Sequence, residues 1–197
     1  MKTIRDELIA DIKNSEVSDI YSRYLKSHEV WLFKHMMKVD DPHKFFDQLK
    51  QYIQDQLGIH SANIAIAGSA KTGFSFSPKK DFKQFDESSD LDVILVDSSR
   101  FNDSWSALLD LKYRGKLSNT KHLSFNIFRR FVSLKNEDYD HSYFNDWFKL
   151  TNSFKKDFQT AFEIESDFTY RIYDSWDSVD RYHLAGIAAL KESLIGD

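Results

Sequence analysis

Apolar residues in the N-terminal part of the chain recur at intervals typical of helices. The first such run extends from Ile4 to Ile12. A clearer helix is predicted after Asp41, which can cap it, and Gly58 can end it. We therefore expect residues 1–58 to form a helical N-terminal part.

The apolar pattern changes from helical to strand-like spacing after this part. Residues 63–67 predict a short strand that ends at Gly68-Ser69, and residues 90–97 predict a second strand with acids at its start. The alternation in residues 168–173 predicts a third strand. The remaining predicted helices cover residues 101–112, 123–134, 143–162 and 179–194.

This order of elements predicts an α+β fold, with a small mixed β-sheet flanked by helices. We expect one domain over residues 1–197. Its core would comprise residues 59–197, with a helical insertion at about residues 101–162.

The composition narrows the class of protein. Hydrophobic residues make up 41% and charged residues 29% of the chain, as in soluble globular proteins. Cysteine is absent, which excludes disulfides and thiolate metal sites. No signal-peptide core or membrane-spanning run is visible, so we expect a cytoplasmic protein that does not bind membranes. The net charge of −4 argues against general binding of polyanions, although Arg129-Arg130 and Lys79-Lys80 form small basic clusters.

Asp90 and Asp92 are the strongest chemical signal. Residues i and i+2 of a strand point to the same face, so the two carboxylates would lie side by side. Such a pair is stabilised by a hard cation such as Mg²⁺, which also binds phosphate oxygens. Taken alone, an Asp-x-Asp pair is also common on solvated surfaces.

Gly68-Ser69 is the second signal. Glycine allows a phosphate to approach the backbone closely, and the following amides and the Ser69 hydroxyl can donate to phosphate oxygens. Taken alone, a Gly-Ser turn is usually structural. Together the two motifs give an ordered pattern of strand, Gly-Ser turn, polar loop, acidic pair and strand.

Over about Ile64 to Val96, this pattern resembles the core signature of the DNA polymerase β-type nucleotidyltransferase superfamily. The resemblance is closest to bacterial stand-alone members, including those of toxin–antitoxin and antiphage defence loci, which implies an operon-encoded partner protein. It also implies a nucleotidyltransferase-like core in which the acidic pair binds two Mg²⁺ (or Mn²⁺) ions. The motif residues that would contact the nucleotide are Gly68, Ser69 and Ser89.

The loop of residues 70–89 is longer than is usual in this family. Its aromatic residues are compatible with an ordered lid or with an anchored surface loop that has no catalytic role. Its lysines, Lys79, Lys80 and Lys83, are expected to form a solvated basic loop, with contact to substrate phosphates as the alternative.

The family also has a third carboxylate on a later, adjacent strand. In the strand of residues 168–173, parity favours Asp167 over Asp174, although Asp167 also suits a turn. Arg171 shares the expected face of Asp167 and would either bind phosphate or, as we favour, pair with a carboxylate.

We therefore expect an enzyme that transfers a nucleoside monophosphate from an NTP such as ATP to an acceptor hydroxyl. Asp90, Asp92 and Asp167 would be the catalytic and metal-binding residues, and Arg171 a nucleotide-binding one. The acceptor would be tRNA or another RNA, a protein, a small molecule or a second nucleotide. The alternative is an inactive relative that senses a nucleotide or serves as a complex subunit. A third reading is a nucleic-acid-binding protein whose acidic pair is incidental, which would need a continuous basic groove.

Overall fold

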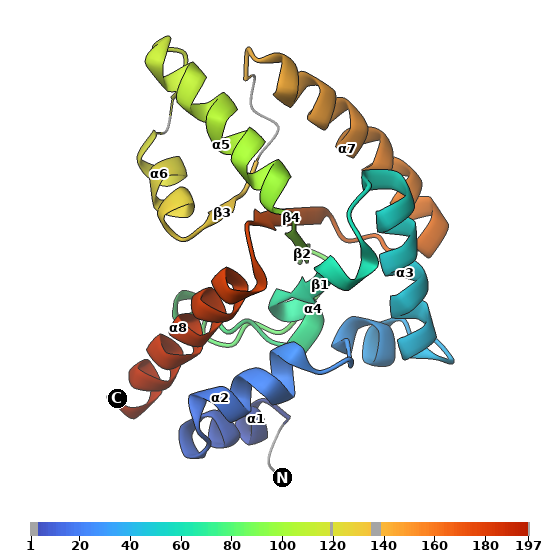
Figure 1. Cartoon of the computed structure of the whole chain (residues 1–197). Helices are drawn as coiled ribbons and strands as arrows, with labels where there is room; N and C mark the ends of the chain where they lie inside the picture. Colours follow the sequence, from blue (N-terminus) through green and yellow to red (C-terminus); the bar gives the residue numbers. More distant parts are fainter. Residues whose placement is uncertain (1–3, 119, 135–138, 197) are drawn as a thin grey trace.

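A four-stranded mixed sheet lies at the centre of the molecule (Figure 1). The computed structural model describes residues 4–118, 120–134 and 139–196. The strand order is β1-β2-β4-β3. The central pair, β2 and β4, is parallel, and the outer pairs are antiparallel. The strands are β1 (Ile64–Ala67), β2 (Leu91–Val96), β3 (Phe131–Val132) and β4 (Phe168–Tyr173).

Helices surround this sheet, and the α+β class expected from the sequence is confirmed. They are α1 (Ile4–Asn14), α2 (Val17–Ile20), α3 (Pro42–Leu57), α4 (Gly68–Thr72), α5 (Ser98–Tyr113), α6 (Thr120–Phe128), α7 (Ser142–Phe162) and α8 (Trp176–Ile195), with π-helical segments at Tyr21–Lys26 and Leu32–Met36. Helix α3 has the predicted ends: Asp41 accepts a hydrogen bond from the Lys44 amide, and Gly58 adopts a left-handed conformation. None of the helices in the described ranges is both long and apolar enough to cross a membrane.

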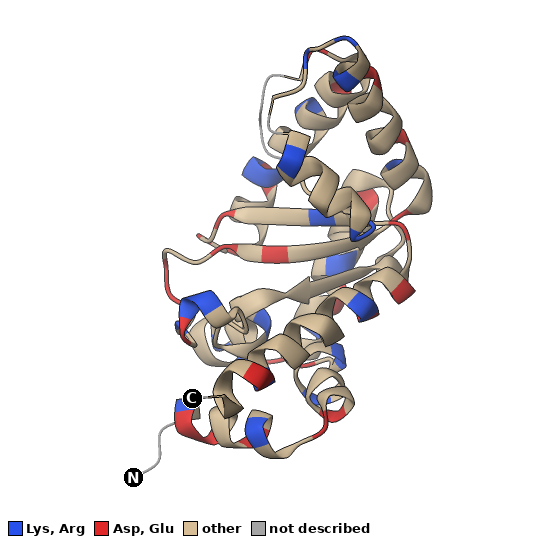
Figure 2. Cartoon of the chain, turned by 90° about the vertical axis from the view of Figure 1, so that its left-hand side faces the viewer, with Lys and Arg blue, Asp and Glu red and all other residues tan. Residues whose placement is uncertain are grey.

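One face of the sheet forms the main apolar core. Leu91, Val93 and Leu95 alternate along β2, and each is at most 1% exposed. They pack in one cluster with residues of α3, α5 and α7. Figure 2 shows these layers from the side, with the strands running between two groups of helices.

Helix α8 covers only part of the opposite face. Its Val179 packs in a smaller cluster with Ile94 and Val96 of β2 and Tyr173 of β4. Apolar residues of α1 and α2 pack against Ile187, farther along α8. The beginnings of β2 and β4 therefore lack an apolar cover on this face, and Asp92 and Thr169 lie there.

The helix predicted over residues 123–134 is wrong at its C-terminal end. Helix α6 ends at Phe128, Arg130 adopts a positive φ of 64°, and Phe131 and Val132 form β3. Strand β3 pairs with Tyr173 and Ile172 of β4. Burying these two apolar residues at the sheet edge stabilises the fold more than continuing an exposed helix would.

Candidate nucleotide site

The Gly-Ser turn, Gly68-Ser69, lies directly against the Asp92 carboxylate. Strand β1 ends at Ala67, which pairs with Asp92 across the sheet. Gly68 then adopts a φ of +66°, a conformation that favours glycine. A Cβ atom at Gly68 would overlap the Asp92 carboxylate, so the position requires glycine for two separate reasons. The fold thus joins the two sequence motifs.

A buried lysine holds the short helix that follows the turn. Lys71 of α4 is 4% exposed, and its Nζ donates hydrogen bonds to the carbonyl oxygens of Ser27 and Glu29. Burial lowers the pKa of Lys71 to about 8, and the nearby Glu29 carboxylate opposes that shift. The N-terminal segment therefore fixes the position of the Gly-Ser turn.

The acidic pair, Asp90 and Asp92, occupies the start of β2 on the face that α8 leaves open. Asp90 is exposed, whereas Asp92 is half-buried. Thr169, which pairs with Asp92 in the register of β2 and β4, donates a hydrogen bond of 2.8 Å from Oγ1 to Asp92 Oδ1. This bond orients the carboxylate and leaves its Oδ2 on the side of Gly68.

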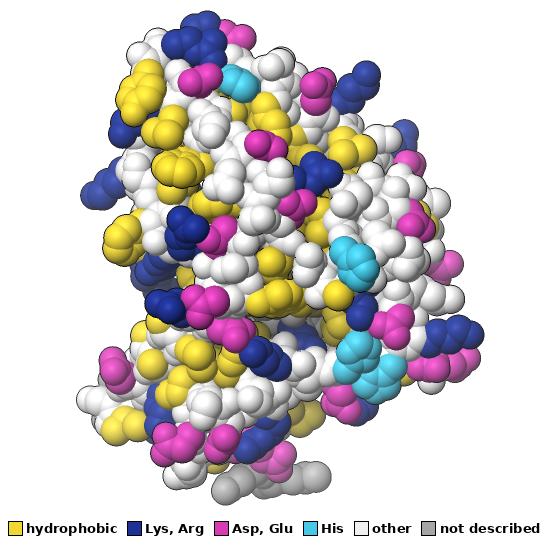
Figure 3. Space-filling model, in the orientation of Figure 1, with side chains coloured by type: hydrophobic (Ala, Val, Ile, Leu, Met, Phe, Trp, Pro, Cys, Tyr) yellow, Lys and Arg dark blue, Asp and Glu magenta, His cyan; other side chains and the backbone are white. Residues whose placement is uncertain are grey.

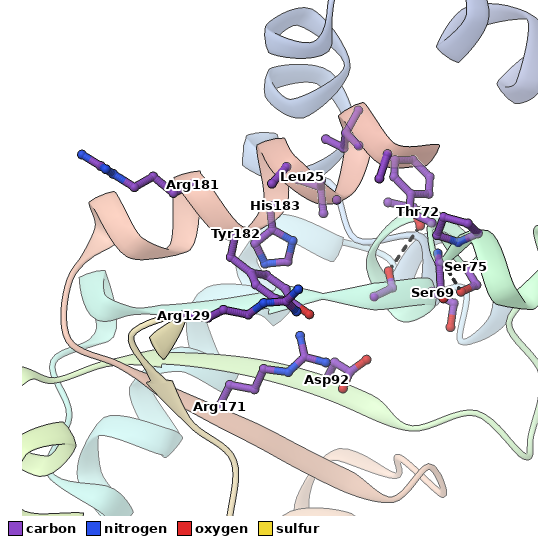
Figure 4. Close-up of a pocket in the computed structure, with 18 of the residues that line it drawn as sticks. Leu25, Ser69, Thr72, Ser75, Asp92, Arg129, Arg171, Arg181, Tyr182 and His183 are labelled. Atoms are coloured by element: carbon purple, nitrogen blue, oxygen red, sulfur yellow. Dashed lines mark hydrogen bonds between the residues drawn. The ribbon is translucent and has the colours of Figure 1, made fainter. Parts of the chain in front are cut away.

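A cavity of about 750 Å³ brings four predicted site residues together. Gly68, Ser69, Asp92 and Arg171 all line it, and Figure 4 shows Arg171 extending toward Asp92. A smaller recess of about 80 Å³ shares Ser69 and Asp92 with the cavity and adds Asp90 and Ser89. The acidic pair and the Gly-Ser turn therefore border one connected region.

The loop of residues 70–89 is anchored by buried aromatic rings. Phe74, Phe82 and Phe85 are at most 6% exposed. Lys83 pairs with Asp86 over 3.1 Å, and the Ser89 hydroxyl donates to that same Asp86 carboxylate over 3.0 Å. Hydrogen bonds from Ser88, Lys83 and Ser89, in decreasing order of effect, lower the pKa of the Asp86 carboxyl below its usual range.

Asp167 lies beside Asp90, immediately before the paired residues Leu91 of β2 and Phe168 of β4. Its carbonyl oxygen accepts a hydrogen bond of 2.8 Å from the Leu91 amide, immediately before β4 begins. Its side chain is exposed and lines neither the cavity nor the recess. Burial lowers the pKa of the nearby Lys155 of α7, and the carboxylates of Asp167 and Asp90 oppose that shift. Asp174 pairs with Arg130 over 2.7 Å.

Among the described residues, no group of three or more His, Asp or Glu side chains could hold a metal ion by itself. Two carboxylates still suit Mg²⁺, which commonly takes one or two carboxylates and completes its octahedral shell with water and substrate phosphates. Asp90 and Asp92 share one face, border one recess and flank the Gly-Ser turn. This donor set fits a metal that arrives with a triphosphate.

Arg171 does not make the carboxylate pair that the sequence favoured. Within the described residues, no carboxylate lies at ion-pairing distance from it. Its guanidinium instead lies 5.7 Å from the Phe131 ring centre and 5.5 Å from that of Tyr182. Burial lowers its pKa, but Tyr173, Tyr182 and Asp92 together raise it, with a net upward shift. Arg171 is therefore a permanent cation beside Asp92.

Several residues in or beside the cavity were not predicted from sequence as site residues. Arg129 and Tyr182 line the same cavity as Arg171, and Thr169 orients Asp92. His183 of α8 also lines the cavity, and its Nε2 is buried without a hydrogen-bond partner among the described residues. Burial and Arg171 lower its pKa to about 4, against the opposing effects of Asp92 and Asp180, so the ring is neutral at pH 7. The helical spacing of α8 carries no signal for the positions of Tyr182 and His183 in the cavity.

Comparisons with protein-family models, with curated proteins and with solved structures found no match to this chain. A functional assignment therefore rests on the chemistry of the site.

Proposed function

We propose that the chain binds an NTP with Mg²⁺ or Mn²⁺ and transfers its nucleoside monophosphate to an acceptor hydroxyl, as polymerase β-type nucleotidyltransferases do. The observation that carries the proposal is the direct contact between the Gly-Ser turn and Asp92 at the edge of a large cavity. A triphosphate on the turn would lie beside carboxylates of the same charge. That arrangement is stable only if a cation neutralises both.

Each group then has a defined task. The backbone amides after Gly68 and the Ser69 hydroxyl would bind phosphate oxygens. Asp90 and Asp92 would hold the metal, which would neutralise phosphate charge and lower the pKa of the acceptor hydroxyl. Arg171 would add a positive charge next to Asp92, and Thr169 would keep the Asp92 carboxylate in place.

In the reaction, the acceptor oxygen forms a bond to the α-phosphorus of the NTP. The bond between the α-phosphorus and the bridging oxygen to the β-phosphate breaks, and pyrophosphate leaves with the electron pair. The acceptor proton passes to solvent or to Asp167, which lies beside Asp90. Positioning and charge neutralisation would supply most of the rate enhancement.

A second candidate function is nucleotide binding without transfer, as in a sensor or a complex subunit. It is favoured by Thr169, an uncharged residue that faces Asp92 from the adjacent strand, and by the exposed position of Asp167 outside the cavity. Both candidates require metal-dependent NTP binding, and they differ only in turnover.

The test is incubation of the protein with each labelled NTP, Mg²⁺ or Mn²⁺, and candidate acceptors. We expect pyrophosphate release or label transfer, and its loss in the Asp90→Ala/Asp92→Ala variant. An Asp167→Asn variant that binds NTP but does not turn over would identify Asp167 as the third catalytic acid. NTP binding without any transfer in the wild type would favour the second candidate, and no NTP binding would exclude both.

A further inference from the structure

The cavity is strongly basic although the whole chain is acidic. Lys80, Arg129, Arg130, Arg171 and Arg181 line it, whereas Asp92 is its one acidic lining residue among those described. The net charge of the chain is −4. Positive charge is therefore concentrated at the place where a polyanionic ligand would enter.

Two of the four arginines are free of ion pairs within the described residues. Arg130 is engaged by Asp174 and Arg181 by Asp177, each over 2.7 Å. No carboxylate in the described ranges lies at ion-pairing distance from Arg129 or Arg171. Each of these two guanidiniums lies 5.5 Å from the centre of the Tyr182 ring, and Figure 4 shows all three side chains at the same end of the cavity.

Exposed aromatic rings continue this end of the cavity onto the surface of α6. Phe128 lines the cavity and is 86% exposed, and Phe125, one turn earlier, is 52% exposed. The Arg129 guanidinium lies 3.9 Å from the Phe125 ring centre. Figure 3 shows hydrophobic and basic side chains interspersed along the side of the molecule where α6 lies.

Large apolar rings in water cost free energy, so rings at a cavity mouth are typical of binding surfaces. Unpaired bases stack on such rings, while neighbouring arginines bind the phosphates between the bases. A single nucleotide inside the cavity could reach Phe128 but would leave Phe125, which does not line the cavity, uncovered. A strand that extends from the cavity across α6 would cover both rings.

We propose that the rim formed by Phe125, Phe128 and Arg129 binds a single-stranded nucleic acid, whose 3′ end enters the cavity as the acceptor. The choice of acceptor rests on the proposed nucleotidyl transfer, whereas strand binding by the rim does not. Because the two rings and the arginines recognise bases and phosphates without reading a sequence, binding should be tolerant of sequence and sensitive to salt.

The chain contains a matched control for the rim. Phe128 and Arg129 are an exposed aromatic–arginine pair at the C-terminal end of α6. Tyr113, 81% exposed, and Arg114 form a similar pair at the end of α5, and neither lines the cavity. The variants Phe128→Ala/Arg129→Ala and Tyr113→Ala/Arg114→Ala thus remove the same kinds of group from exposed sites.

Binding would be measured by fluorescence anisotropy with a labelled RNA of about 12 nucleotides, without NTP or divalent metal. We expect Phe128→Ala/Arg129→Ala to weaken binding about tenfold or more, and the control variant to change it by less than about twofold. The duplex of the same sequence should bind more weakly, and AMP should compete poorly. Binding should decrease as salt is raised.

Equal effects of the two double variants would overturn the proposal, as would absence of RNA binding by the wild type. Competition by AMP at the same concentration as the RNA would assign the rim to a mononucleotide instead. If the RNA binds as expected but NTP does not, the proposed nucleotidyl transfer fails and strand binding by the rim stands.

Discussion

The residues from Asp90 to Val96 present two faces, one apolar and buried in the core and one with two carboxylates at the recess. Leu91, Val93 and Leu95 lie in the apolar core beneath α3, α5 and α7. Asp90 and Asp92 alternate with them and border the open recess beside the Gly-Ser turn. The apolar face stabilises the fold by removing its side chains from water. The acidic face places two like charges side by side, which destabilises the fold and is typical of a binding site.

The largest expected effect concerns the apolar face. Leu95→Ala removes a fully buried side chain and leaves a cavity, so the free energy of unfolding should fall by about 2–5 kcal/mol. Urea denaturation would measure this change. NTP affinity of the folded protein should stay within about twofold, because Leu95 points away from the site. A loss below about 1 kcal/mol would show that this face is loosely packed.

His183, which lines the cavity, makes the free energy of unfolding depend on pH. Its folded pKa of about 4 lies below the ordinary value of 6.5, so the unfolded chain takes up a proton first as pH falls. The free energy of unfolding should therefore decrease from about pH 6.5 to about pH 4, by on the order of 3 kcal/mol, and level off below.

His183→Gln removes this titration and keeps a neutral polar side chain. Denaturation curves of wild type and variant across this pH range isolate the histidine from the carboxylates, which titrate in both proteins. Identical pH dependence in the two proteins would mean that His183 is not buried in its neutral form.

Gly68→Ala tests the contact between the Gly-Ser turn and Asp92. The new Cβ would displace the carboxylate, so NTP affinity in the presence of Mg²⁺ should fall about tenfold or more. Gly115→Ala is the matched control: its φ of +67° imposes similar backbone strain, but its Cβ would meet nothing within 4 Å. Both variants should lose about 1–2 kcal/mol of stability. Equal NTP affinity in the two variants would show that the Gly-Ser turn does not contribute to NTP binding.

Thr169→Val should have the smallest effect. It removes the hydrogen bond to Asp92 and preserves the shape of the side chain, so NTP affinity should fall about fivefold. Thr160→Val provides the control, since Thr160 donates to the Lys156 carbonyl on the exposed surface of α7. Calorimetric titration of both variants would measure the difference. A wild-type affinity for Thr169→Val would mean that Asp92 keeps its orientation without this bond.

Local signals in the sequence predicted the elements that depend on nearby residues. Asp41 and Gly58 marked the ends of α3, and alternation along β4 separated its buried residues, up to Ile172, from Thr169 and Arg171. Strand β3 was missed because two residues are too few for a periodic signal, and their strand geometry comes from pairing with β4.

The arginine end of the cavity depends on long-range packing, which no local pattern records. Arg129 follows α6, Arg171 lies in β4 and Tyr182 in α8, and only the packing of these elements brings the three side chains together. Their separate sequence contexts resemble ordinary surface or core positions. The bond from Thr169 to Asp92 likewise depends on strand register.

The most direct test is calorimetric titration of a non-hydrolysable ATP analogue with and without Mg²⁺, using wild type, Asp92→Asn and Asp103→Asn. Asp103 is an exposed acid of α5, so its variant makes the same change away from the site. We expect binding that requires Mg²⁺, loss of at least about 100-fold in affinity in Asp92→Asn, and wild-type affinity in Asp103→Asn. Absence of metal-dependent binding in the wild type, or equal binding by the two variants, would contradict a metal–triphosphate site at Gly68-Ser69 and Asp90/Asp92.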